Sequence, residues 1–161
     1  MFNLKAEFYL KIIFLFSFIA LISAFFIEYI LGHQPCNLCL IERIPYGLSI
    51  MIIMSIFLIK KNQKFLVMLL ILTFIFSFAI SFYHFGIEQG FFQESSVCGV
   101  KSSTEIVTKE DLLKQLSEKT ISCKDVTFRI FGLSLTSINI VISVLFIITL
   151  LKIFKKYEKN K

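Results

Sequence analysis

The stretch FLVMLLILTFIFSFAISFYHF, residues 65–85, contains no Asp, Glu, Lys or Arg. A helix needs ~20 predominantly apolar residues to cross a hydrocarbon core of ~30 Å. Over the whole chain of 161 residues, 57% are hydrophobic and 17% are charged, whereas soluble domains are usually ~45–50% apolar. We therefore expect an integral membrane protein with a single membrane domain over residues 1–161.

Three other stretches share this length and composition, and they run over about residues 8–31, 38–59 and 130–151. Together the four spans predict an all-α fold, a four-transmembrane-helix bundle. The first span is too apolar over too great a length for a removable signal peptide, so we expect a retained anchor. Its Lys11 and Glu28 lie near the two ends, where we expect both side chains to reach the lipid headgroups.

Lysine-rich segments fix the predicted orientation. The short turn KKNQK (60–64) and the segment LKIFKKYEKNK (151–161) are cytoplasmic by the positive-inside rule. Both termini are then cytoplasmic, and residues 32–37 and 86–129 form the outer loops. This topology accounts for the net charge of +6, so we expect no nucleic acid partner. Within the second outer loop, TKEDLLKQLSEK (108–119) has a capping pattern and three leucines that predict a short periplasmic helix.

All four cysteines fall on the outer side in this topology, where disulfides persist. Cys36 and Cys39 form a Cys-x-x-Cys pair, and Cys98 and Cys123 lie in the long outer loop. A bridge between the loop cysteines would stabilise the fold by roughly 3.5 kcal/mol in the loop-entropy model. A purely structural role is therefore as plausible for them as a chemical one. The number of cysteines alone leaves three possible disulfide pairings.

The Cys36–Cys39 pair points to redox chemistry. A disulfide between these two cysteines would close only a small loop and would stabilise the fold by only about 1.9 kcal/mol. A structural zinc site needs four clustered ligands, and the other two cysteines lie far downstream in the sequence. We therefore expect no metal at this pair. A c-type haem needs His directly after the second cysteine, and Leu40 stands there.

Two charged residues follow this pair. If the second span starts at Leu38, Cys39 lies in the first helical turn, where the helix dipole favours a thiolate. Arg43 is four residues on, on the same helix face, and Glu42 is three on. Our hypothesis is that Arg43 stabilises the Cys39 thiolate and the negative charge of an electron acceptor arriving from the lipid. The alternative is an arginine that reaches the lipid phosphates.

His84 lies near the end of the third span, at the depth of Cys39. It could donate a hydrogen bond to a carbonyl acceptor or pass a proton, and a surface histidine without a role is the alternative. Asn139, in the last span, is expected to bond across helices.

The order of these motifs resembles the DsbB family of quinone-dependent disulfide oxidoreductases. The resemblance rests on Cys-x-x-Cys before the second span, the following Glu-Arg, YHFGIE (83–88), the two separate loop cysteines, and FGLSL (131–135) before the fourth span. It implies a bacterial cytoplasmic (inner) membrane protein whose active cysteines face the periplasm. It also implies a membrane quinone, ubiquinone or menaquinone, as the acceptor, held by Arg43, Glu42 and His84.

The same resemblance implies a relay through all four cysteines. Cys98 would be attacked by a reduced DsbA-like carrier, a periplasmic protein of thioredoxin fold. Cys123 would then attack Cys36, and Cys39 would pass the electrons to the quinone. Two alternatives stay open: a vitamin K epoxide reductase-like enzyme, although its Cys-x-x-Cys comes late in the chain, and a non-catalytic membrane subunit with structural disulfides.

Overall fold

The computed structural model describes residues 4–59, 62–93, 98, 123, 129–130 and 133–159. It contains the helices α1 (Leu4–Tyr29), α2 (Asn37–Leu58), α3 (Gln63–Glu88) and α5 (Leu135–Lys159). Each has the length and the apolar composition to cross a membrane. The predicted fold class, a membrane bundle of four helices, is confirmed.

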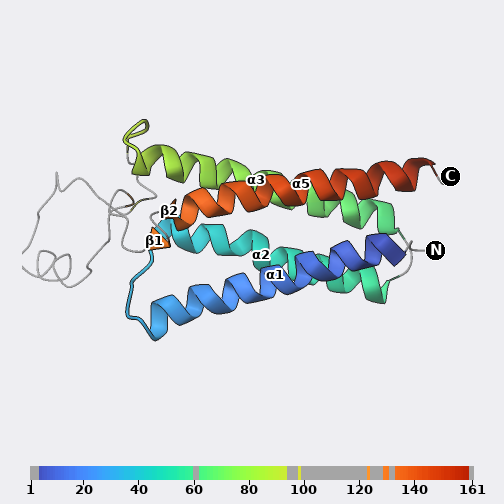
Figure 1. The fold of residues 1–161 in the computed structure, drawn as a ribbon, viewed down its shortest axis with the longest axis horizontal. Coiled ribbons are helices and arrows are strands. Elements are labelled where there is room, and N and C mark those ends of the chain that lie inside the picture. The colour runs from blue at the N-terminus through green and yellow to red at the C-terminus, as the bar shows by residue number, and fades with distance from the viewer. Residues whose placement is uncertain are drawn as a thin grey trace, which may run out of the picture.

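The four helices lie side by side along one long axis (Figure 1). α1 packs on α2, α2 on α3, and α3 on α5, whereas α1 and α5 touch only slightly. Both chain ends lie at one end of the bundle, and the connection from α1 to α2 lies at the other. The cysteines gather at this second end.

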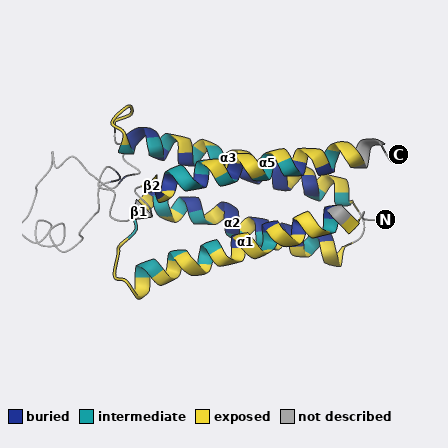
Figure 2. Ribbon diagram, viewed as in Figure 1, coloured by how far each residue is buried: buried dark blue, intermediate teal, exposed yellow. Residues whose placement is uncertain are grey.

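Each of the four helices carries both exposed and buried residues (Figure 2). Many of the exposed residues are large and apolar. This inversion of the usual soluble pattern is what lipid requires, because hydrocarbon does not penalise exposed Leu, Ile or Phe. The central packing includes Leu10, Ile53, Leu70, Phe74 and Leu150, all fully buried. Small hydroxyl residues interrupt it, and Ser49 Oγ donates to Ser17 Oγ at 3.0 Å.

The helices begin and end at other residues than the sequence predicted. α1 spans Leu4–Tyr29 rather than 8–31, and α3 continues beyond residue 85 to Glu88. α5 begins at Leu135 instead of residue 130, because the chain first forms a tight antiparallel ribbon. In that ribbon β1 (Arg129–Ile130) pairs with β2 (Leu133–Ser134).

Two local features shape the end of the bundle that holds the cysteines. α2 begins at Asn37 with Cys36 as its N-cap, and the helix continues through Pro45. α3 ends in a turn that needs Gly90 at φ +77°, a conformation that glycine adopts without strain. The predicted helix over 108–119 lies outside the described residues.

Candidate functional site

The Cys-x-x-Cys pair occupies the N-terminus of α2. The Cys36 sulfur accepts a hydrogen bond from the Cys39 backbone N–H at 3.3 Å, so Cys36 caps the helix. The two Sγ atoms lie 2.7 Å apart, and both residues are free cysteines. The pair is therefore arranged to interconvert between dithiol and disulfide with little movement.

His84 lies against this pair from α3. Its Nε2 is 3.6 Å from Cys36 Sγ, and its Nδ1 is 2.9 Å from Glu42 Oε1 on α2. The ring is 2% exposed, so the surface-histidine alternative is wrong. His84 joins the sulfur of Cys36 to the carboxylate of Glu42.

The loop cysteines meet the same cluster. Cys98 and Cys123 are both buried, and they pack with Cys36, Leu38 and Ile87. All four cysteines, far apart in the sequence, thus gather at one end of the bundle.

The surroundings give the sulfurs opposite acid–base character. A hydrogen bond with the Cys39 thiol lowers the pKa of Cys36 to about 4, although burial opposes this, and His84 adds to the lowering. Burial raises the pKa of the Cys123 thiol, and its hydrogen bond with Cys98 raises it further. Negative charge is therefore more stable on Cys36 than on Cys123.

Arg43 has a partner that the sequence did not suggest. Its Nη1 donates to Glu28 Oε2 on α1, and its guanidinium lies 5.3 Å from the centre of the Phe25 ring. Glu28 was expected at the headgroups, but it forms this ion pair within the bundle. The hydrogen bond of the Arg43 guanidinium runs to Glu28 and not to Cys39.

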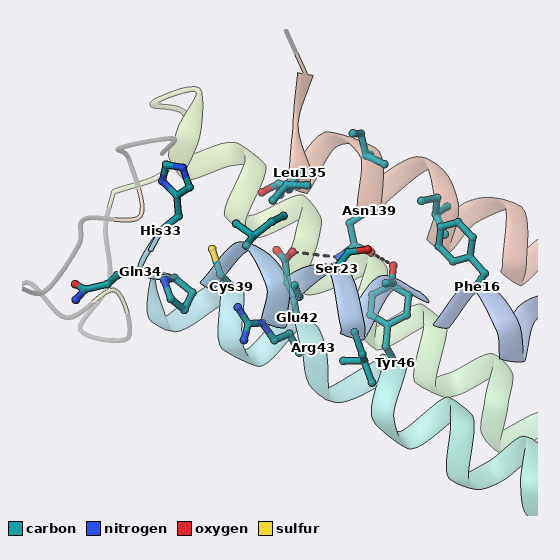
Figure 3. Close-up of a pocket in the computed structure, with 18 residues that line it drawn as sticks. Phe16, Ser23, His33, Gln34, Cys39, Glu42, Arg43, Tyr46, Leu135 and Asn139 are labelled. Carbon is teal, nitrogen blue, oxygen red and sulfur yellow. Dashed lines mark hydrogen bonds between the residues drawn. The ribbon is translucent and has the colours of Figure 1, made fainter. Parts of the chain in front are cut away.

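A cavity of about 270 Å³ lies beside the pair, between α1, α2 and α5 (Figure 3). Its walls are mainly apolar, including Phe16, Leu21, Ile27, Ile138 and Ile142. At one end its lining becomes polar, with Cys39, Glu42, Arg43, Tyr46 and Asn139. This lining fits a ligand with an apolar body and a polar, hydrogen-bonding head.

Only some of the predicted site residues line this cavity. Cys39, Glu42 and Arg43 line it, whereas His84 is not among the lining residues. His84 is linked to the cavity wall through hydrogen bonds with Glu42 and Thr136, which both line the cavity. Cys36 lies behind Cys39 on the side of the loop cysteines.

Asn139 organises the polar end of the cavity. Its Nδ2 donates to Glu42 Oε2 at 3.1 Å and to Ser81 Oγ at 2.7 Å, while the Tyr46 hydroxyl donates to its Oδ1. The expected bonding across helices is present, since these partners lie on α2 and α3. Sequence reasoning did not connect Asn139, Tyr46 or Glu28 to the site, although a polar residue within an apolar span was a usable signal.

Comparisons with known proteins agree with this geometry. The family model for DsbB, disulfide bond formation protein DsbB, matches residues 6–153. The chain is also 31% identical over 147 residues to the uncharacterized protein RP370 of Rickettsia prowazekii (strain Madrid E), covering 90% of this chain and 86% of that protein. No solved structure gave a significant match. The chain belongs to the DsbB family and is a multi-pass membrane disulfide oxidoreductase.

Proposed function

We propose that this protein reoxidises a periplasmic dithiol carrier of thioredoxin fold, of the DsbA type, and passes the electrons to a membrane quinone. One observation carries the proposal: Cys39 lines an apolar cavity, while Cys36, 2.7 Å behind it, packs against both loop cysteines. The sulfurs thus form a continuous route from the end of the bundle to the cavity.

Thiol–disulfide exchanges move the electrons along this route. The reduced carrier attacks Cys98 of a Cys98–Cys123 disulfide and leaves oxidised, with both loop cysteines as thiols. Cys123 then attacks Cys36 of a Cys36–Cys39 disulfide and releases Cys39 as a thiolate. Attack of Cys98 on Cys123 restores the loop disulfide and leaves Cys36 and Cys39 reduced.

The acid–base contrast supports this direction of flow. A lowered pKa at Cys36 stabilises the reduced form of its pair, and a stabilised reduced form makes a disulfide a stronger oxidant. The raised pKa of Cys123 disfavours its thiolate in the loop pair. Electrons therefore move from the loop pair to the Cys36–Cys39 pair.

The cavity supports a quinone as the final acceptor. When bound, a quinone accepts two electrons and two protons from the Cys36–Cys39 dithiol, which closes to a disulfide. In our proposal Arg43 binds the polar head through its guanidinium, and Glu42 holds a proton at the cavity wall. His84, between Cys36 and Glu42, provides a path by which protons pass between the cysteine pair and that carboxylate.

We further propose that the protein lies in a bacterial cytoplasmic membrane with its cysteines on the periplasmic side. The lysine-rich segments at 60–64 and 151–161 support this orientation. Their described residues, 62–64 and 151–159, lie at the end of the bundle opposite the cysteine cluster.

A purified-protein assay tests the function. Reduced carrier and a soluble quinone are added to the protein in detergent, and quinone reduction is followed by its absorbance change. We expect turnover in the wild type and none in Cys39→Ser. Wild-type protein that oxidises the carrier without reducing quinone would contradict the proposed acceptor.

A trapping experiment separates the oxidoreductase from a subunit with structural disulfides. A carrier that retains only its attacking cysteine should form a mixed disulfide with the oxidised protein, and Cys98→Ser should abolish that product. A product that persists in Cys98→Ser would place the attack at another sulfur.

A further inference from the structure

We propose that the reduced Cys36–Cys39 pair and His84 form a binding site for a thiophilic divalent cation of the zinc class. Occupancy of this site would hold both sulfurs as thiolates and block their oxidation. The inference rests on the packing of α2 against α3. It does not require that a quinone is the electron acceptor.

The three ligand atoms are already gathered. The two Sγ atoms and an imidazole nitrogen of His84 lie within 4.8 Å of one another. In tetrahedral zinc sites the Zn–S distance is ~2.3 Å and the Zn–N distance ~2.0–2.1 Å, which places neighbouring ligand atoms about 3.5 Å apart. Cys36 Sγ and His84 Nε2, at 3.6 Å, have that separation.

One adjustment is needed at the other ligand pair. The sulfurs, now 2.7 Å apart, must separate by about 1 Å to bind one ion at the bond lengths of zinc sites. Cys39 is only half-buried and lines the cavity, so its side chain has room to rotate.

The surroundings of His84 match those of a metal ligand. Histidines that bind metals commonly donate their other ring N–H to a carboxylate, which fixes the ring and raises its basicity. Here Nδ1 lies 2.9 Å from Glu42 Oε1, and Glu42 is held in turn by Asn139. Nε2 is thereby directed at the sulfurs.

Glu88 lies outside the group of three gathered ligand atoms, and its carboxylate must turn toward them to supply the fourth ligand. It lies one helical turn after His84 on α3, and its Oε1 is 3.8 Å from His84 Nε2. Its side chain is 5% exposed, and Oε2 is buried without a hydrogen-bond partner. A buried carboxylate oxygen without a partner is costly, and a bound cation would supply one.

The chemistry makes the site sensitive to redox state. A thiol that binds the ion gives up its proton to solvent, and no electron moves. A Cys36–Cys39 disulfide offers no thiolate, so the oxidised protein lacks the site.

The test uses Cd²⁺ as the probe and a Cys98→Ser/Cys123→Ser background, which removes the other thiols. Reduced protein in detergent is titrated, and the ultraviolet thiolate-to-cadmium charge-transfer band is recorded. We expect one ion per chain when the pair is reduced and no band after oxidation with diamide. Absence of the band in the reduced protein would overturn the proposal.

Matched variants then assign the ligands. His84→Ala should weaken binding more than about 100-fold, and Glu42→Gln, which changes the support of the ring, about 10–100-fold. His33→Ala, at the other histidine, should leave the affinity unchanged. Equal affinities in the His84 and His33 variants would remove His84 from the site.

Two measurements on the wild-type sequence guard against misfolded variants. X-ray absorption of the reduced, zinc-loaded chain should show two sulfurs and two nitrogen or oxygen ligands, and any other sulfur count would overturn the proposal. Zinc should also stop oxidation of the pair by diamide, an oxidant independent of the proposed acceptor, and a chelator should restore it. Oxidation at an undiminished rate would refute the blocking effect while leaving the proposed quinone chemistry untouched.

Discussion

Arg43 is held by an acid that competes with any anionic ligand in the cavity. The Glu28 carboxylate and the polar head of an acceptor would share one guanidinium at the cavity wall. A hydrogen bond to a charged group contributes ~1.5–3 kcal/mol. Loss of Arg43 therefore removes binding energy, and loss of the Glu28 charge removes a competitor.

We expect Arg43→Leu to raise the KM for quinone about 10–100-fold, the change that this energy range implies. Glu28→Gln should lower the KM, because a neutral amide holds the guanidinium less tightly. Glu7→Gln, an acid near the other end of α1, is the matched control and should change nothing. Steady-state kinetics over a range of quinone concentrations measures all three. An unchanged KM in Arg43→Leu would show that the guanidinium does not bind the acceptor.

Cys36 should react as a thiolate over an unusually wide pH range. Its pKa is lowered to about 4 by the hydrogen bond from Cys39, so the thiolate persists as the pH falls and is lost only near that value. In the reduced protein we expect its alkylation by iodoacetamide to be nearly independent of pH between about 5 and 8. Cys39→Ala removes the donor, and alkylation of Cys36 should then rise with pH. Peptide mass spectrometry measures both rates, and a steep pH dependence in the wild type would contradict this assignment.

At the scale of the element, the end of α3 depends on the absence of a side chain at Gly86. A Cβ there would lie 2.1 Å from Phe92 Cδ2, and Phe92 stacks on Tyr83 with ring centres 5.8 Å apart. The Phe91 and Phe92 N–H groups also donate to the Gly86 carbonyl at 2.8 and 3.1 Å. The glycine thus allows the chain to fold back beside His84.

Gly86→Ala should destabilise the protein by about 1–3 kcal/mol, the usual cost of overpacking. Gly47→Ala on α2 is the matched control, because a Cβ at that position would have nothing within 4 Å and alanine favours a helix. Thermal unfolding in detergent, followed by circular dichroism, compares the two. Equal midpoints would show that Phe92 moves away without cost.

Asn139 ties α5 to both α2 and α3 through three side chains. Asn139→Ala leaves the Glu42, Ser81 and Tyr46 groups with unmet hydrogen bonds at buried sites. We expect a loss of roughly 1–3 kcal/mol in unfolding free energy. Val141→Ala, at an exposed residue of the same helix, should cost much less when measured by the same unfolding experiment.

For the whole molecule, the two ends of the bundle should be reachable from opposite sides of the membrane. In a chain with its four cysteines replaced by serine, an impermeant maleimide applied to right-side-out vesicles should label Gln89→Cys, at an exposed residue just after α3. In a chain with its four cysteines replaced by serine, Lys156→Cys should be labelled only in inverted vesicles. Labelling of both residues from the same side would refute the proposed topology.

Much of the fold could be predicted because its signals are local. Four apolar runs predicted the four helices, and the spacing of Cys39 and Arg43 placed both on one face at the start of the second helix. The ribbon before α5 was missed because Ile130, Phe131 and Leu133 are apolar and extended the fourth apolar run toward the N-terminus. Composition alone could not show that the helix starts only at Leu135.

The parts of the site that were missed depend on contacts between helices. Glu28 meets Arg43, and Glu42 meets His84, only because α1 and α3 present particular faces to α2. Glu88 was not considered, because nothing in the sequence shows that its carboxylate is buried beside His84. The expectation that no metal binds rested on the cysteines alone, and the sequence could not show that His84 lies beside Cys36 and Cys39.

The slight contact between α1 and α5 has a practical consequence. Both helices line the cavity beside Cys39, yet each is secured mainly by another neighbour, α1 by α2 and α5 by α3. The seam between them faces hydrocarbon, so small molecules would enter sideways from the bilayer. The effective dose of an inhibitor acting there would depend on its partitioning into lipid. Among compounds of equal intrinsic affinity, those with longer hydrocarbon chains would be more potent.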